Sequence, residues 1–183
     1  MVLPLKAIGQ INLKQNRTNK KFVYLISPNK IDNKDFYTDL SLVLKSKKVS
    51  FFQLRLKNET SKKKLIIGKK IKKICKKYKV KFLINDDPRL AKKLDADGCH
   101  LGQKDMNIIK ARKILKKKII YKANTKILNS VKKITNTPIV AIGGIKLVNY
   151  KKLLLNKANF LAISGYIWNN KKYKPFEAIK KLK

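Results

Sequence analysis

Cysteine is scarce in this chain of 183 residues, and the two that occur are Cys75 and Cys99. Neither lies in a CxxC pair or in a Cys/His spacing of the kind that binds zinc. A disulfide-stapled scaffold and a zinc-binding domain are therefore not expected. We predict that both cysteines are buried free thiols.

Long apolar runs are also missing. The N-terminal stretch MVLPLKAIGQINLKQ lacks the apolar run of roughly 7 to 15 residues that a signal peptide carries behind its basic start. No segment approaches the roughly 18 to 20 apolar residues that a membrane span needs. We therefore expect a cytoplasmic protein with no membrane partner.

Acidic residues are few, ten against 47 lysines and arginines, which gives a formal net charge of +37. Clustered cations often bind nucleic acids, because they neutralise phosphates and release counterions. Arginine, which suits bidentate contacts to phosphates and base edges, occurs only at Arg17, Arg55, Arg89 and Arg112. The lysines are therefore predicted to cover solvated helix faces and to steer phosphorylated substrates, without a specific nucleic-acid site. Electrostatic binding to nucleic acid is the alternative, and it predicts an affinity that falls steeply with salt.

The chain does contain a regular alternation of short apolar runs and amphipathic segments. The amphipathic segments have apolar residues at helical spacing, as in 61–78, where Thr60 or Ser61 can supply the N-cap. This order predicts parallel strands joined by helical crossovers. Runs rich in β-branched or aromatic residues are predicted to form the strands: 22–26, 49–55, 80–84, 99–101, 118–123, 138–142 and 160–164.

The length of the chain limits the fold. A full eight-unit barrel typically needs about 250 residues and seldom fewer than about 200. Residues 1–20 are polar without clear periodicity, and we predict an extension that is mobile or plugs the barrel bottom. Residues 21–183 are then a single TIM-type (β/α) barrel domain, shortened or incomplete, with about seven βα units. An open doubly wound sheet is the alternative, although no G-x-G-x-x-G follows the first strand.

Half of the ten acidic residues fall in one short stretch, FLINDDPRLAKKLDADGCHLGQKD, together with the only histidine, His100. Asp86 and Asp105 follow two strand runs, so we expect them at the carboxyl ends of neighbouring strands, where barrel enzymes assemble their sites. Mg²⁺ prefers carboxylates completed by water and substrate phosphate, so both are predicted metal ligands. His100 is either a core residue or part of the site, and no nucleophile beside it suggests a triad. The other acids are predicted to be helix caps or solvated turn residues: Asp87, Asp95 and Asp97.

Two further patterns indicate binding of an anionic ligand. Strand alternation puts Gln53, Arg55 and Lys57 on one face, and polar side chains that point into a barrel mouth require a polar or anionic ligand. An outward-facing basic strand is the alternative. Glycine turns follow two late strand runs, at 143–144 and at 165, and glycines let backbone N–H groups approach phosphate oxygens.

Taken in order, five segments resemble the thiamine-phosphate synthase family, which includes a thiazole tautomerase branch: QLRLKN, LINDD, DADGCHLGQKDM, PIVAIGGI and FLAISGYIW. Members are barrel enzymes that join 4-amino-5-hydroxymethyl-2-methylpyrimidine diphosphate to thiazole phosphate and release pyrophosphate. The resemblance implies a Mg²⁺-dependent transferase of thiamine biosynthesis whose partners are small phosphorylated substrates. It implies nothing about oligomeric state.

The resemblance also implies roles for particular residues. Those implied to bind the pyrimidine diphosphate are Gln53, Arg55, Lys57 and Asn85, with Arg55 and Lys57 as the catalytic cations at the leaving group. The implied Mg²⁺ ligands are Asp86 and Asp105. Those implied to meet the thiazole phosphate are Gly144, Ile163 and Ser164.

The chain departs from the family pattern between residues 120 and 137. The family carries a strand ending in Gly-Val-Ser, whereas this chain has Ile-Tyr-Lys-Ala at 120–123. A further strand and a Thr-x-Thr-Lys loop that binds phosphate should follow, but residues 124–137 are enough for one helix at most. Lys122, Thr125 or Lys126 are candidates to replace the lost contacts. A degenerate, non-catalytic member that binds a phosphorylated metabolite is therefore the alternative function.

Overall fold

Strands and helices alternate along the chain in the computed structural model, which describes residues 2–4, 22–32, 34–102, 105–116, 119–122, 139–155 and 158–183. The strands are β1 (Val2–Pro4), β2 (Val23–Ile26), β3 (Val49–Leu54), β4 (Lys81–Asn85), β5 (Gly98–Leu101), β6 (Ile119–Lys122), β7 (Ile139–Ile142) and β8 (Phe160–Ile163). The helices are α1 (Asp35–Lys45), α2 (Ser61–Lys77), α3 (Pro88–Lys93), α4 (Ile108–Leu115), α6 (Tyr150–Leu155), α7 (Gly165–Trp168) and α8 (Pro175–Lys181).

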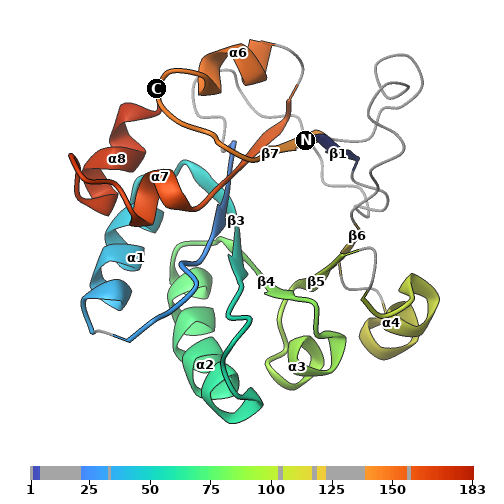
Figure 1. Cartoon of the computed structure of the whole chain (residues 1–183). Coiled ribbons are helices and arrows are strands. Elements are labelled where there is room, and N and C mark those ends of the chain that lie inside the picture. The colour runs from blue at the N-terminus through green and yellow to red at the C-terminus, as the bar shows by residue number, and fades with distance from the viewer. Residues whose placement is uncertain are drawn as a thin grey trace.

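One sheet joins all of these strands, in the order β1-β7-β8-β2-β3-β4-β5-β6. Every pairing from β7 to β6 is parallel, and Figure 1 shows the strands curving around a common centre with the helices outside. Among the described residues, β1 and β6 are the two ends of the sheet and do not pair with each other. The predicted TIM-type barrel with seven parallel strands is confirmed, and it is incomplete.

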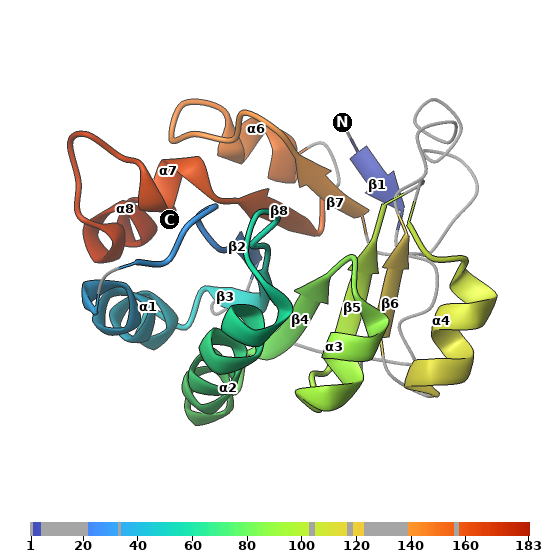
Figure 2. The ribbon, with the colours of Figure 1, turned by 60° about the horizontal axis from the view of Figure 1, so that its bottom comes forward.

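The N-terminal residues include an element that the sequence did not predict. Residues 2–4 form β1, which pairs antiparallel with β7 in the register Val2↔Ala141. Figure 2 shows β1 beside β7, at the edge of the sheet. A three-residue strand is too short for its alternation to be recognised in the sequence. The assignment of residues 1–20 to an N-terminal extension stays a prediction. Residues 5–20 lie outside the described residues.

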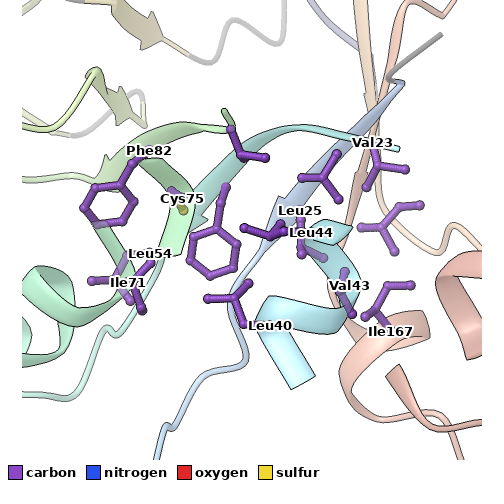
Figure 3. Packing of buried hydrophobic residues seen from close by; sticks show 14 of the residues in the cluster. Val23, Leu25, Leu40, Val43, Leu44, Leu54, Ile71, Cys75, Phe82 and Ile167 are labelled. Atoms are coloured by element: carbon purple, nitrogen blue, oxygen red, sulfur yellow. The ribbon is translucent and has the colours of Figure 1, made fainter. Parts of the chain in front are cut away.

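The parallel strands bury both faces. One cluster lies inside the barrel and includes Tyr24 of β2, Phe51 of β3 and Leu83 of β4. The larger cluster lies between the sheet and the helices, where Leu25, Phe52 and Leu54 meet residues of α1 and α2. Figure 3 shows this layer, with Leu40, Val43 and Leu44 of α1 on one side and Ile71 and Cys75 of α2 on the other. Each such side chain contributes about 1.5–3 kcal/mol when fully buried.

The helix caps and turn residues lie where the sequence predicts them. The Thr60 hydroxyl accepts the backbone N–H of Lys63 at 3.2 Å, and the Asp87 carboxylate accepts those of Arg89 and Leu90 at 2.9 Å. Asp95 and Asp97 form ion pairs with Lys72 and Lys81. The predicted assignment of these three acids to caps and turns is thereby supported.

Both cysteines are buried and free, as predicted. Over the described ranges, no helix combines the length and the apolar composition needed to cross a bilayer.

Candidate active site

Polar side chains gather at the carboxyl ends of β2, β3, β4 and β5. The register pairs Ile26 with Gln53 and Asn85 with His100, so the ends of the four strands lie at one level. Alternation along β3 turns Phe51 into the barrel, while Phe52 and Leu54 pack against helices. Gln53, two residues after Phe51, is therefore inward and only 3% exposed. This orientation agrees with the inward interpretation for Gln53, whereas Arg55 and Lys57 lie beyond the end of β3.

A chain of hydrogen bonds crosses three of these strands. The Tyr24 hydroxyl donates to Gln53 Oε1 at 2.8 Å. Gln53 Nε2 donates to Asn85 Oδ1, and Asn85 Nδ2 donates to the Asp86 carboxylate. Tyr24 was not predicted as a site residue, although its place two residues before Ile26, at inward register, was a signal for it.

Asp86 occupies a turn directly after β4. Its φ is +64°, a left-handed conformation that aspartate tolerates better than most residues, and its N–H donates to the His100 carbonyl at 2.7 Å. Burial raises the pKa of Asp86, and the nearby Asp105 carboxyl raises it further, while Lys57 and Arg55 oppose the shift. The resulting pKa is about 6. The predicted carboxylate pair therefore converges, with both predicted catalytic cations near enough to act on it.

Gly102 holds Asp105 in place. The Gly102 N–H donates to Asp105 Oδ2. A Cβ at residue 102 would stand 2.7 Å from that same oxygen, so any larger residue would push the carboxylate away. No sequence pattern indicated this role, because a glycine between a strand and a turn usually serves only the conformation of the backbone.

This donor set suits Mg²⁺ better than a metal that needs a cage of protein ligands. No group of three or more His, Cys, Asp or Glu residues gathers in the part of the chain that the structure describes. The pKa of Asp86 is raised by burial and by the neighbouring Asp105 carboxyl, and a divalent cation bound between the two side chains would offset that repulsion. Mg²⁺ typically takes one or two carboxylates and completes its shell with water and substrate oxygens.

Arg55 follows β3 and is oriented by the loop after β2. Its N–H donates to Ser27 Oγ at 2.9 Å, and its Nη1 donates to Asn29 Oδ1 at 3.3 Å. Ser27 is 2% exposed and also accepts, through its carbonyl, the hydroxyl of Ser164 at 3.1 Å. Ser27 was missed by sequence reasoning, since a lone serine after a strand resembles any turn residue.

Lys57 lines a cavity of about 310 Å³ together with Asn85 and Asp86. Lys64 of α2 lines the same cavity. The lining thus combines lysines, an amide and carboxylates with apolar side chains of the layer between sheet and helices, and it does not include Arg55 or Asp105.

A second cavity, of about 470 Å³, lies at the ends of β7 and β8. Its lining includes the three predicted phosphate contacts: Gly144, Ile163 and Ser164. Gly143 and Gly144 have φ of +102° and +57°, a region that favours glycine. The Asn149 side chain braces this turn by donating to the Gly144 carbonyl and accepting the N–H of Lys146. The turn thus exposes backbone to the cavity.

His100 lies at the wall of the site, on β5. Burial lowers its pKa to about 4; the Asp105 carboxylate opposes that shift, and Arg55 reinforces it. The imidazole is therefore neutral at physiological pH. Its half-buried position beside the carboxylates favours a site residue over a core residue.

The segment where the chain departs from the family pattern is described only in part. Lys122 is the last residue of β6, in register with Leu101 of β5. Thr125 and Lys126 lie outside the described residues. Their suggested role in binding phosphate stays a prediction.

The fold and the site together define a (β/α)-barrel enzyme that gathers carboxylates and cations at the carboxyl ends of its strands. A family model described as thiamine monophosphate synthase matches residues 23–121, which is more than half of the chain. The chain belongs to the thiamine monophosphate synthase family.

Relatives of this chain support the assignment. A thiamine-phosphate synthase of Pelagibacter ubique is 66% identical over 207 residues, covering 93% of this chain and 100% of the relative. One of Fusobacterium nucleatum is 41% identical over 112 residues, covering 61% of this chain and 54% of the relative. The alignment with the Pelagibacter protein is longer than the 183 residues of this chain, so that relative carries residues that this chain lacks.

A solved structure supports the fold. Thiamine phosphate pyrophosphorylase from Pyrococcus furiosus superposes with a TM-score of 0.77 at 22% identity, over 90% of this chain and 94% of that one. At this level of identity the likeness concerns the architecture alone.

Proposed function

We propose that this protein is a Mg²⁺-dependent thiamine-phosphate synthase, which joins hydroxymethylpyrimidine diphosphate to thiazole phosphate and releases pyrophosphate. The observation that carries the proposal is the convergence of Asp86 and Asp105 beside Arg55 and Lys57. The 66% identity to a thiamine-phosphate synthase supports the same conclusion.

In this reaction the bond between the pyrimidine methylene carbon and the diphosphate oxygen breaks, and the thiazole nitrogen forms a new bond to that carbon. The leaving group takes the bonding electrons, so negative charge grows on the diphosphate. Arg55, which is half-buried, and Lys57, which is exposed, would neutralise that charge. A bound Mg²⁺ would be held by Asp86 and Asp105 and would supply further charge neutralisation.

The remaining residues position the two substrates. Gln53 and Asn85 would bind the pyrimidine diphosphate through their amides, as the hydrogen-bond chain between them supports. The glycine turn at 143–144 and the Ile163–Ser164 backbone would receive the thiazole phosphate in the second cavity. Holding both substrates in line replaces an encounter in solution by a reaction between fixed neighbours.

Purified full-length protein incubated with both substrates and Mg²⁺ should form thiamine phosphate and pyrophosphate in equal amounts, measured by chromatography. The exposed Asp95→Asn variant is a matched control for Asp86→Asn, since both remove one carboxylate. Folded wild-type protein that forms no product would refute the proposal.

A degenerate binding protein is the second candidate, and the residues that this chain lacks relative to the Pelagibacter protein favour it. Calorimetry with each substrate alone separates the two. Tight binding of the pyrimidine diphosphate with neither thiazole phosphate binding nor turnover would support the binding protein. A cytoplasmic location and a single domain over residues 21–183 stay predictions.

A further inference from the structure

The hydrogen bonds from Tyr24 to Asp86 all run in one direction, and their donors are the Tyr24 hydroxyl, Gln53 Nε2 and Asn85 Nδ2. A carboxylate accepts hydrogen bonds and cannot donate them, so Asn85 must present its NH₂ group to Asp86. Its Oδ1 then faces Gln53, which must in turn present its own NH₂ group. Gln53 Oε1 is left facing Tyr24, and only a donor satisfies it there.

Tyr24 supplies that donor from an enclosed position. The residue is 4% exposed, and its ring packs against Phe51 with centroids 5.6 Å apart. Gln53 is 3% exposed, so water has little access to its amide oxygen. Without the hydroxyl, Gln53 Oε1 would be buried without this partner, and the amide would gain from rotating away.

We propose that Tyr24 is a positioning residue that holds the Gln53 amide with its NH₂ group toward Asn85, while the Asp86 carboxylate holds Asn85 from the other end. Each amide NH₂ carries a second hydrogen, so the fixed orientation leaves each amide with one further donor for a ligand. Donors match the acceptor-rich diphosphate and reject ligands that need an acceptor there. The inference rests on the proposed function for the identity of the ligand, but the orientation of the amides does not depend on it.

The Tyr24→Phe variant tests the role, because it removes the hydroxyl and keeps the ring on Phe51. Calorimetry with the pyrimidine diphosphate and Mg²⁺ should show about tenfold weaker binding, as expected when a buried amide loses its partner. Binding of thiazole phosphate should be unchanged. The Tyr37→Phe variant, which alters a tyrosine of α1 outside the site, is the matched control and should bind like the wild type.

A double-mutant cycle separates positioning from direct contact. If Tyr24 acts through Gln53, then adding Tyr24→Phe to Gln53→Ala should weaken binding no further. An equal, about tenfold loss in both backgrounds would mean that Tyr24 contacts the ligand or supports the fold by another route. That result would overturn the proposal.

Side-chain amide resonances give a readout that needs no ligand. In ¹⁵N-labelled protein, the NH₂ signals of Gln53 and Asn85, the former assigned from Gln53→Ala, should both shift in Tyr24→Phe and stay in place in Tyr37→Phe. Unmoved signals would overturn the proposal even if binding changed. If the wild type binds no pyrimidine diphosphate, the proposed function fails. The amide signals still decide whether Tyr24 orients Gln53 through the hydrogen-bond chain.

Discussion

The two halves of the site are built in different ways. Around Asp86, side chains of β2, β3 and β4 and of the turns that follow the strands interact through hydrogen bonds and charge. The two amides and the Asp86 carboxyl group therefore have fixed directions. Around Gly144, a glycine turn and the end of β8 leave a cavity lined largely by backbone and apolar side chains. A half built from side chains depends on the identity of each residue. A half built from backbone depends on the shape of a turn.

The Asp86→Asn variant should show the largest effect. It keeps the size of the side chain but removes a carboxylate from the metal pair, so turnover should fall by about 100-fold or more, or about 3 kcal/mol in the barrier. Steady-state kinetics over a range of Mg²⁺ concentrations would measure this. An equal loss of activity in Asp95→Asn would point to a general effect of charge. It would then contradict the view that the Asp86 half depends on the identity of each residue.

Gly102→Ala should have the next largest effect. The new Cβ would crowd Asp105 Oδ2, so the carboxylate must move and Mg²⁺ binding should weaken by about tenfold, or about 1.4 kcal/mol. Titration of activity with Mg²⁺ would detect the change, and thermal unfolding without metal would separate it from a loss of fold. A Mg²⁺ requirement equal to that of the wild type would contradict the role given to Gly102.

Ser164→Ala tests whether the halves are independent. Its hydroxyl donates to Ser27, which also binds the backbone of Arg55, so the variant loosens a contact between the end of β8 and Arg55. We expect KM for thiazole phosphate to rise roughly fivefold, or about 1 kcal/mol, with a smaller rise for the pyrimidine diphosphate. The Ser41→Ala variant on α1 is the control. Equal changes for both substrates would mean that Ser27 couples the halves and that they act as one unit.

The smallest effect concerns pH and stability. The pKa of Asp86 is about 6 in the folded protein and near 3.8 when unfolded, so the folded state binds more protons between these values. Raising the pH from 4 to 6 should therefore destabilise the metal-free protein relative to Asp86→Asn.

Mg²⁺ needs the carboxylate form, so it should raise the melting temperature more at pH 7.5 than at pH 5. Thermal unfolding of both proteins at several pH values measures these shifts. If the stability of Asp86→Asn depends on pH in the same way as that of the wild type, the pH dependence comes from another titratable group.

The fold could be predicted because period-two and helical patterns repeat seven times, and each unit reinforces the others. β1 was not predicted because three residues are too few to show an alternation of apolar and polar side chains. The paired acids and the Gln53 face could be predicted because they are chemically unusual in so basic a chain. The inward register of Tyr24 was a signal for that residue, but its partner Gln53 is distant in the sequence. The roles of Ser27 and Gly102 could not be predicted, since Ser27 acts on the distant Arg55 and Gly102 acts through its backbone N–H. Such contacts exist only once the strands are side by side.

The most direct test is the reaction itself. Folded full-length protein, given both substrates and Mg²⁺, should produce thiamine phosphate and one pyrophosphate per product, and chelation of the metal should stop it. Binding of the pyrimidine diphosphate without any thiamine phosphate would contradict the account and leave a binding protein in its place.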